Sequence, residues 1–123
     1  MKALLIVAHG SRRQASNQEV FNLAQSISTR SDHDFDVVEA AFLEIADILI
    51  PDGIEQCAKA GATEIIVMPY FLNSGKHVTQ DIPEVITAIK SQYPDITIHV
   101  TKHLGASPVM ADLVLQTATT LLR

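Results

Sequence analysis

Short apolar runs alternate with amphipathic segments along the chain, and this alternation constrains the fold more than any other feature of the sequence. Runs typical of β-strands occupy residues 3–8, 35–41, 63–68 and 96–100. The segments that follow each of these runs carry apolar residues at helical spacing. Strands that alternate with helices in this way predict an α/β protein built on a four-stranded parallel sheet.

Each amphipathic segment has one apolar stripe that is expected to pack against the sheet. Helices are expected at residues 14–28, before Gly61, after Asp81 and after Pro108, with Asp81 as the cap of the third. The predicted inward-facing residues are Val20, Leu23, Ala24 and Ile27; Ile50, Ile54, Cys57 and Ala58; Ile82, Val85, Ile86 and Ile89; Met110, Leu113, Val114 and Leu121.

The order of the elements predicts a single domain over residues 1–123, since neither a linker nor a low-complexity segment interrupts the pattern. Right-handed crossovers favour a doubly wound sheet with strand order 2-1-3-4. In that order the chain reverses direction between the first and third strands. Ligands of such sheets bind at this reversal, outside the carboxyl ends of the strands.

Composition excludes several classes of protein. The net charge is −5, with 14 acidic and 9 basic residues and no basic run, which argues against a nucleic-acid partner. Every apolar stretch is much shorter than the roughly 20 residues of a membrane-spanning helix. The first strand begins almost at Met1 without a signal-like segment, so we expect a cytoplasmic protein. The lone cysteine, Cys57, is expected to be a packed core residue.

Three ionisable side chains follow the strands that meet at the predicted site. His9 follows the first strand, His77 follows the third, and Glu44 follows the second, better placed than Glu39 within that strand. Two imidazoles and a carboxylate suit either a first-row divalent metal or proton transfer near neutral pH. The alternative is that each histidine is a turn residue bonded to backbone and that Glu44 is solvated.

Basic residues are concentrated around the two histidines. Arg12, Arg13 and Lys76 would form a positive rim on an otherwise acidic protein, and an anionic small molecule is the ligand that such a rim favours. His103, after the fourth strand, is expected to be a peripheral ligand contact. The alternative for the three cations is a solvated rim.

Three motifs together resemble those of a known family. They are "HGSR" at residues 9–12, "AFLE" at residues 41–44 and "IIVMPYFLNSGKHVTQDIP" at residues 65–83. Their order, spacing and context over nearly the whole chain resemble the sirohydrochlorin chelatases of the CbiX and SirB type, in the short form with one chelatase domain. One departure is Gln80, which stands where relatives often carry a basic residue.

The resemblance implies insertion of cobalt or ferrous iron, and in some members nickel, into sirohydrochlorin without ATP, for cobalamin or sirohaem synthesis. It implies a homodimer, and it makes the metal a substrate, with no cofactor expected. His9 and His77 would hold the metal and accept pyrrole protons, and Glu44 would be a third ligand or proton acceptor. The residues expected to contact the tetrapyrrole are Ser11, Arg12, Arg13, Tyr70, Phe71, Lys76 and His103.

Two other functions fit part of the sequence. A carrier that binds tetrapyrrole or metal without inserting it would use the same residues. A phosphotransfer enzyme of the histidine phosphatase kind also has a histidine-glycine pair after its first strand, but an arginine precedes that histidine. Ala8 occupies this position here, so the phosphate-binding partner is missing.

Overall fold

In the computed structural model, which describes residues 1–122, four strands form one parallel sheet in the order β2-β1-β3-β4. The strands are β1 (Lys2–Ala8), β2 (Val37–Phe42), β3 (Glu64–Pro69) and β4 (Thr97–Val100). In the register, Val7 of β1 lies beside Ala41 of β2 and Pro69 of β3. The strand order predicted from the crossover rule is confirmed, and so is the position of the chain reversal between β1 and β3.

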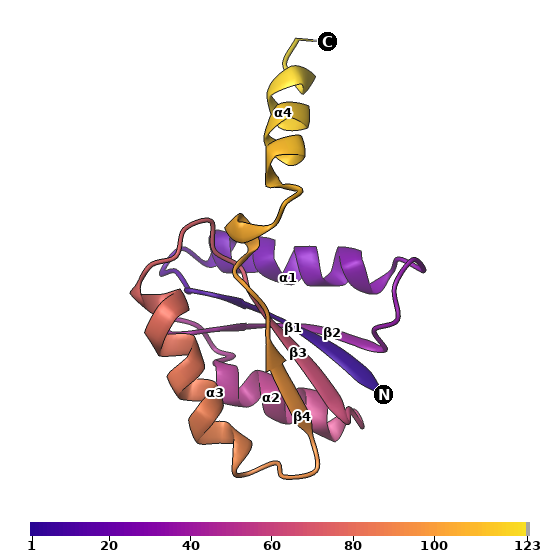
Figure 1. The fold of residues 1–123 in the computed structure, drawn as a ribbon, viewed down its shortest axis with the longest axis vertical. Helices are drawn as coiled ribbons and strands as arrows, with labels where there is room; N and C mark the ends of the chain where they lie inside the picture. Colours follow the sequence, from indigo (N-terminus) through magenta and orange to yellow (C-terminus); the bar gives the residue numbers. More distant parts are fainter. Residues whose placement is uncertain (123) are drawn as a thin grey trace.

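Helices cover both faces of the sheet (Figure 1). On one face lies α1 (Gln14–Ser28), and on the other lie α2 (Ile50–Lys59) and α3 (Ile82–Lys90). Two apolar clusters correspond to these layers. Ile6 packs with Val20 of α1, whereas Leu5 belongs to the cluster that contains Ile54 of α2 and Ile82 of α3. Because β1 is buried on both faces, its sequence is a continuous apolar run.

The lone cysteine lies in this core, as its place on the apolar stripe of α2 predicted. Cys57 is fully buried, and burial raises the pKa of its thiol to about 12, with a smaller contribution from the nearby charge of Glu39. The thiol therefore stays protonated near neutral pH.

No helix within residues 1–122 is long and apolar enough to cross a membrane.

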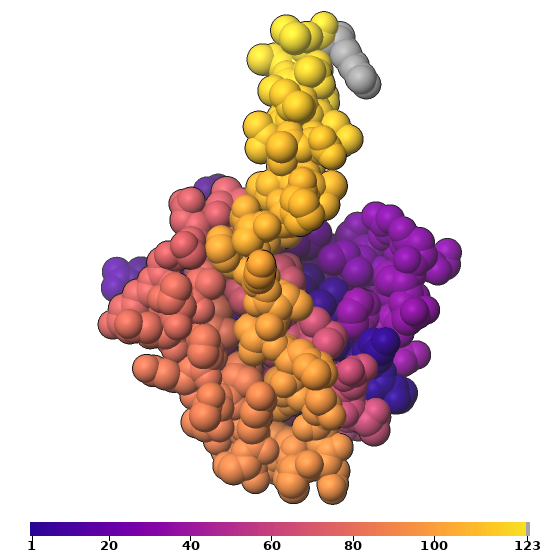
Figure 2. Space-filling model, viewed as in Figure 1, coloured from indigo at the N-terminus to yellow at the C-terminus, as the bar shows by residue number. Residues whose placement is uncertain are grey.

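The predicted packing of the last helix is wrong. Met110, Leu113, Val114 and Leu121 were expected to face the sheet, but α4 (Met110–Thr120) stands clear of it beyond the carboxyl edge (Figures 1 and 2). Leu113 is 51% exposed and Val114 58%. Helical spacing shows which side of a helix is apolar, but it does not show what covers that side.

A short turn sends α4 outward. After β4 the chain forms the 3-10 turn η2 (Leu104–Ala106), where the Gly105 amide donates to the carbonyl of Phe71 at 2.9 Å. A Cβ on Gly105 would stand 1.7 Å from the Leu72 carbonyl oxygen, so only glycine permits this approach. The turn is thereby fastened to the loop after β3, and α4 starts from it, away from the sheet.

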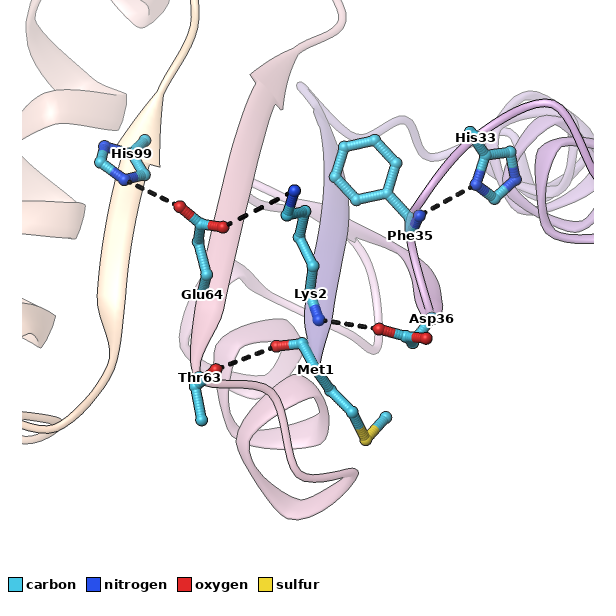
Figure 3. Close-up of polar contacts among 8 residues, drawn as sticks. All are labelled: Met1, Lys2, His33, Phe35, Asp36, Thr63, Glu64 and His99. Carbon is cyan, nitrogen blue, oxygen red and sulfur yellow. Dashed lines mark hydrogen bonds and ion pairs between the residues drawn. The ribbon is translucent and has the colours of Figure 1, made fainter.

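Because α4 does not pack on the sheet, the face that carries α1 is covered only over β1 and β2. On the β3 and β4 side of that face, Ile66 and Met68 are half-buried and His99 is exposed. The side chains of His99, Glu64 and Lys2 form a partly exposed polar row here (Figure 3). The Nε2 atom of His99 lies 3.4 Å and the Lys2 ammonium 4.0 Å from the carboxylate of Glu64. This half of the sheet is bare in the single chain.

The start of the third helix also differs from the prediction. The chain is already helical from His77, because the π-helical turn η1 (His77–Asp81) runs directly into α3. Asp81 therefore has helical backbone angles (φ −66°, ψ −47°) and makes no side-chain cap, since a capping residue needs an extended backbone. The segment around His77, which lies before the predicted start of the third helix, is a helical turn.

Candidate active site

Three chain segments are joined by backbone hydrogen bonds just beyond the carboxyl ends of the strands. The Leu43 amide donates to the carbonyl of Ala8 at 3.0 Å, and the Glu44 amide donates to the carbonyl of His9 at 3.1 Å. On the other side of β1, the Tyr70 amide donates to the carbonyl of Val7 at 2.7 Å. The ladder thus continues past the strands and holds the segments after β1, β2 and β3 together.

Gly10 makes the closest of these approaches possible. Its φ is +100°, a conformation that L side chains rarely adopt, and a Cβ there would stand 1.8 Å from the carbonyl oxygen of Glu44. Ile45, the next residue on the facing loop, has φ +54°, which is unfavourable for a β-branched side chain. Such strain persists where surrounding contacts enforce it, and it is concentrated at functional sites.

The first ionisable pair of the site is His9 with Glu44. The Nε2 atom of His9 lies 2.9 Å from Oε1 of Glu44, and their side chains are 41% and 56% exposed. A carboxylate accepts hydrogen bonds only, so His9 donates through Nε2 and keeps Nδ1 for another partner.

The second pair is His77 with Asp81, a residue that was predicted as a helix cap and not as part of the site. The Nδ1 atom of His77 lies 2.7 Å from Oδ2 of Asp81, one helical turn later in η1. His77 and Asp81 are four residues apart in "HVTQD", and this spacing could have identified Asp81. Residues four apart are neighbours only when the segment is helical.

The two imidazoles face each other. The ring centroids of His9 and His77 are 4.4 Å apart at an interplanar angle of 41°, and the ring of Phe71 lies 6.4 Å from that of His77. Beside them, a cavity of about 260 Å³ is lined by Leu43, Glu44, His77, Asp81, Glu84 and Val85. The geometry offers two adjacent imidazoles, each bonded to its own carboxylate, and His77 and both carboxylates line one cavity.

The structure brings the three predicted residues together in pairs. Glu44 contacts His9, and His9 faces His77. Within residues 1–122, no three His, Cys, Asp or Glu side chains stand at the mutual distances of a metal-ligand set. The carboxylate of Glu44 is instead engaged by His9, so binding of one ion by all three residues would require side-chain rotation.

The residues predicted to contact an anionic ligand lie in the loops around these pairs. Ser11 and Arg12 line a larger cavity of about 610 Å³, between the start of α1 and the loop after β2. Asn17 stabilises the loop after β1, because its side-chain amide donates to the Ser11 carbonyl at 2.8 Å. Arg13 is exposed at the start of α1, and Lys76 is exposed directly before η1.

The remaining predicted contacts belong to an apolar surface after β3. Tyr70 and Phe71 line a cavity of about 220 Å³ together with Leu72 and Leu104. His103 directly precedes η2, the turn that is bonded to Phe71. Leu72, 64% exposed, was not among the predicted residues.

Comparison with known proteins identifies the family. The profile of the family described as CbiX matches residues 3–121. The chain belongs to the CbiX family. The resemblance inferred from the motifs is therefore confirmed.

Curated relatives of this CbiX-family chain are named sirohydrochlorin ferrochelatase or sirohydrochlorin cobaltochelatase. It is 36% identical to the sirohydrochlorin ferrochelatase of Bacillus subtilis over 104 residues, which are 85% of this chain and 39% of the relative. It is also 36% identical to the sirohydrochlorin cobaltochelatase of Methanocaldococcus jannaschii over 93 residues, 76% of this chain and 64% of the relative. The chain thus spans less than two thirds of the length of these relatives.

A solved structure shows the same fold in a longer chain. The sirohydrochlorin chelatase SirB from Bacillus subtilis subspecies spizizenii, in complex with cobalt, matches this CbiX-family chain with a TM-score of 0.84 and 34% identity. The match covers 97% of this chain and 50% of that chain.

Proposed function

We propose that this protein inserts cobalt or ferrous iron into sirohydrochlorin without ATP, for cobalamin or sirohaem synthesis, with nickel as a third candidate metal. The observation that carries this proposal is the pair of facing imidazoles, 4.4 Å apart, each bonded to its own carboxylate at the carboxyl edge of the sheet. The names of the relatives support the substrate, because they include both a sirohydrochlorin ferrochelatase and a sirohydrochlorin cobaltochelatase.

The chemistry of insertion matches these side chains. The macrocycle must lose two pyrrole protons and the ion must lose bound water, and a neutral imidazole can accept either a proton or a metal. In this proposal His9 accepts a proton on Nδ1 while Glu44 stabilises the resulting imidazolium. His77 acts through Nε2, and Glu44 becomes a metal ligand only when its side chain rotates away from His9.

Charge and shape around the site support an anionic macrocycle as substrate. Arg12, Arg13 and Lys76 are exposed and can meet its carboxylates, and each arginine can bind one through two parallel hydrogen bonds. Tyr70 and Phe71 offer an apolar surface beside His77 for the ring. The ion is consumed as a substrate, and the proposed reaction uses no further cofactor.

The direct test is an anaerobic absorbance assay of sirohydrochlorin mixed with cobalt(II), iron(II) or nickel(II), with and without the protein. We expect the protein to accelerate formation of the metallated product, and the rates to rank the three metals. Tight binding of sirohydrochlorin or metal by folded protein, without acceleration for any ion, would reject insertion and establish a carrier. An assay with a generic aryl phosphate should show no turnover, as expected when Ala8 replaces the phosphate-binding arginine.

We further propose that the protein is a homodimer in which α4 of each copy covers the bare half of the partner's sheet. The exposed apolar side of α4 and the incompletely covered β3 and β4 are two unpartnered surfaces of one chain. The eleven residues of α4 span about 16 Å, which is comparable to the length of β3. SirB, about twice as long, has room for two such units in one chain.

The free thiol of Cys57 suits a reducing cytoplasm.

Replacing Leu113 by lysine should convert this dimer into a monomer. Burying a leucine contributes about 1.5–3 kcal/mol, and two-fold symmetry removes this contribution twice, so the dissociation constant should rise about 150- to 25,000-fold. Light scattering coupled to size-exclusion chromatography measures the change. Thr119→Lys adds the same charge to the opposite side of α4 and should leave the mass unchanged. A wild-type monomer would contradict the proposed dimer.

A further inference from the structure

Asp81 is less exposed than the histidine that it contacts. Its side chain is 29% exposed, compared with 44% for His77. The next residue, Ile82, is fully buried in the core, and its amide donates to the carbonyl of His77 across the π-helical turn. Asp81 thus lies where η1 joins α3, with its carboxylate directed back at the imidazole. The carboxylate therefore meets the ring at its Nδ1 atom.

The contact selects one form of the neutral imidazole. A neutral histidine carries its proton on either Nδ1 or Nε2, and the hydrogen bond made by one nitrogen sets the state of the other. The carboxylate of Asp81 only accepts, at 2.7 Å from Nδ1, so it favours the proton on Nδ1 and leaves the lone pair of Nε2 unused. At His9 the assignment is reversed, because Glu44 contacts Nε2.

We propose that Asp81 is a positioning residue that holds neutral His77 with its proton on Nδ1, so that Nε2 is available to the incoming metal or to a pyrrole proton. Carboxylates that bond to the second nitrogen of a metal-binding histidine act in this way in metalloproteins. The role in metal uptake rests on the proposed insertion reaction, whereas the tautomer of His77 can be measured without it.

Glu84 provides a matched control for the loss of negative charge. It lines the same cavity as His77 and Asp81, and it lies in the first turn of α3. The Nδ1 atom of His77, however, is bonded to Asp81. Glu84→Gln therefore removes one negative charge near the imidazole and retains the contact proposed to set the tautomer.

The first experiment is nitrogen NMR of histidine-labelled, metal-free protein at a pH where the imidazole is neutral, with His77 assigned by its loss in His77→Ala. We expect the proton on Nδ1 in the wild type and in Glu84→Gln, and on Nε2 in Asp81→Ala, since Nε2 carries the proton in a free neutral side chain. Asp81→Leu removes the acceptor while filling its space, and it serves if the alanine variant does not fold. An Nε2 proton in the wild type, or an unchanged tautomer in a folded variant, would overturn the proposal.

The second experiment measures insertion kinetics with varied metal concentration. Loss of Asp81 should raise the KM for the metal about 10- to 100-fold and leave the KM for sirohydrochlorin close to that of the wild type. An altered tautomer with an unchanged KM for the metal would reject the role in metal uptake. If the wild-type protein inserts no metal at all, the proposed function fails, while the NMR result still decides the tautomer.

Discussion

Alanine in place of His77 or His9 should lower the rate of metal insertion by about 10²- to 10⁴-fold, the usual contribution of a positioned acid or base. The reason is that each ring keeps one nitrogen free of its carboxylate partner, and the two ring centroids lie only 4.4 Å apart. The double variant should be little slower than either single variant, because groups that act as a unit do not contribute additively. The measurement is the anaerobic absorbance assay with the metal that the wild-type protein inserts fastest.

His33→Ala is the control for this experiment. His33 lies in the turn before β2, where its ring bonds to the Ile27 carbonyl at 2.8 Å and to the Phe35 amide at 3.1 Å. Its loss should affect the stability of that turn and not the rate of insertion. Folded His9→Ala and His77→Ala proteins that insert metal at the wild-type rate would exclude both histidines from the chemistry.

Gly10→Ala should damage both the stability and the activity of the protein. The left-handed backbone conformation alone costs a non-glycine residue about 1–3 kcal/mol. In addition, the new Cβ would stand 1.8 Å from the carbonyl oxygen of Glu44, so the two loops must separate. Since the same loops place the Glu44 carboxylate on His9, insertion should slow together with the loss of stability. Urea unfolding and the insertion assay measure the two effects.

Gly75→Ala is the matched control. Gly75 has no heavy atom within 4 Å of the position that a Cβ would occupy, and it precedes His77 by only two residues. Its substitution should change the free energy of unfolding by less than about 0.5 kcal/mol, as is usual for surface positions. Equal losses in the two variants would show that the loop contact at Gly10 does not build the site.

Most of the fold could be predicted because local patterns and a few packing rules determine it. The apolar run of β1 and the stripes of α1, α2 and α3 predicted elements that the structure contains, and right-handed crossovers reduced the arrangements to the strand order that is observed. The same rules predicted that the ends of β1 and β3 meet, which is why His9 and His77 could be paired across 67 intervening positions of the chain.

The sequence by itself determined the alternation of strands and helices, the core residues of the strands and of α1, α2 and α3, and the sheet edge at which His9, Glu44 and His77 gather. Only the tertiary structure decided the role of Asp81 and the direction of α4. In both cases the physical reason is that the deciding contact is not encoded by a period of apolar residues. Asp81 meets His77 only because residues 77–81 form a helical turn continuous with α3. The helix α4 points away from the sheet because the Gly105 amide of η2 is bonded to the carbonyl of Phe71.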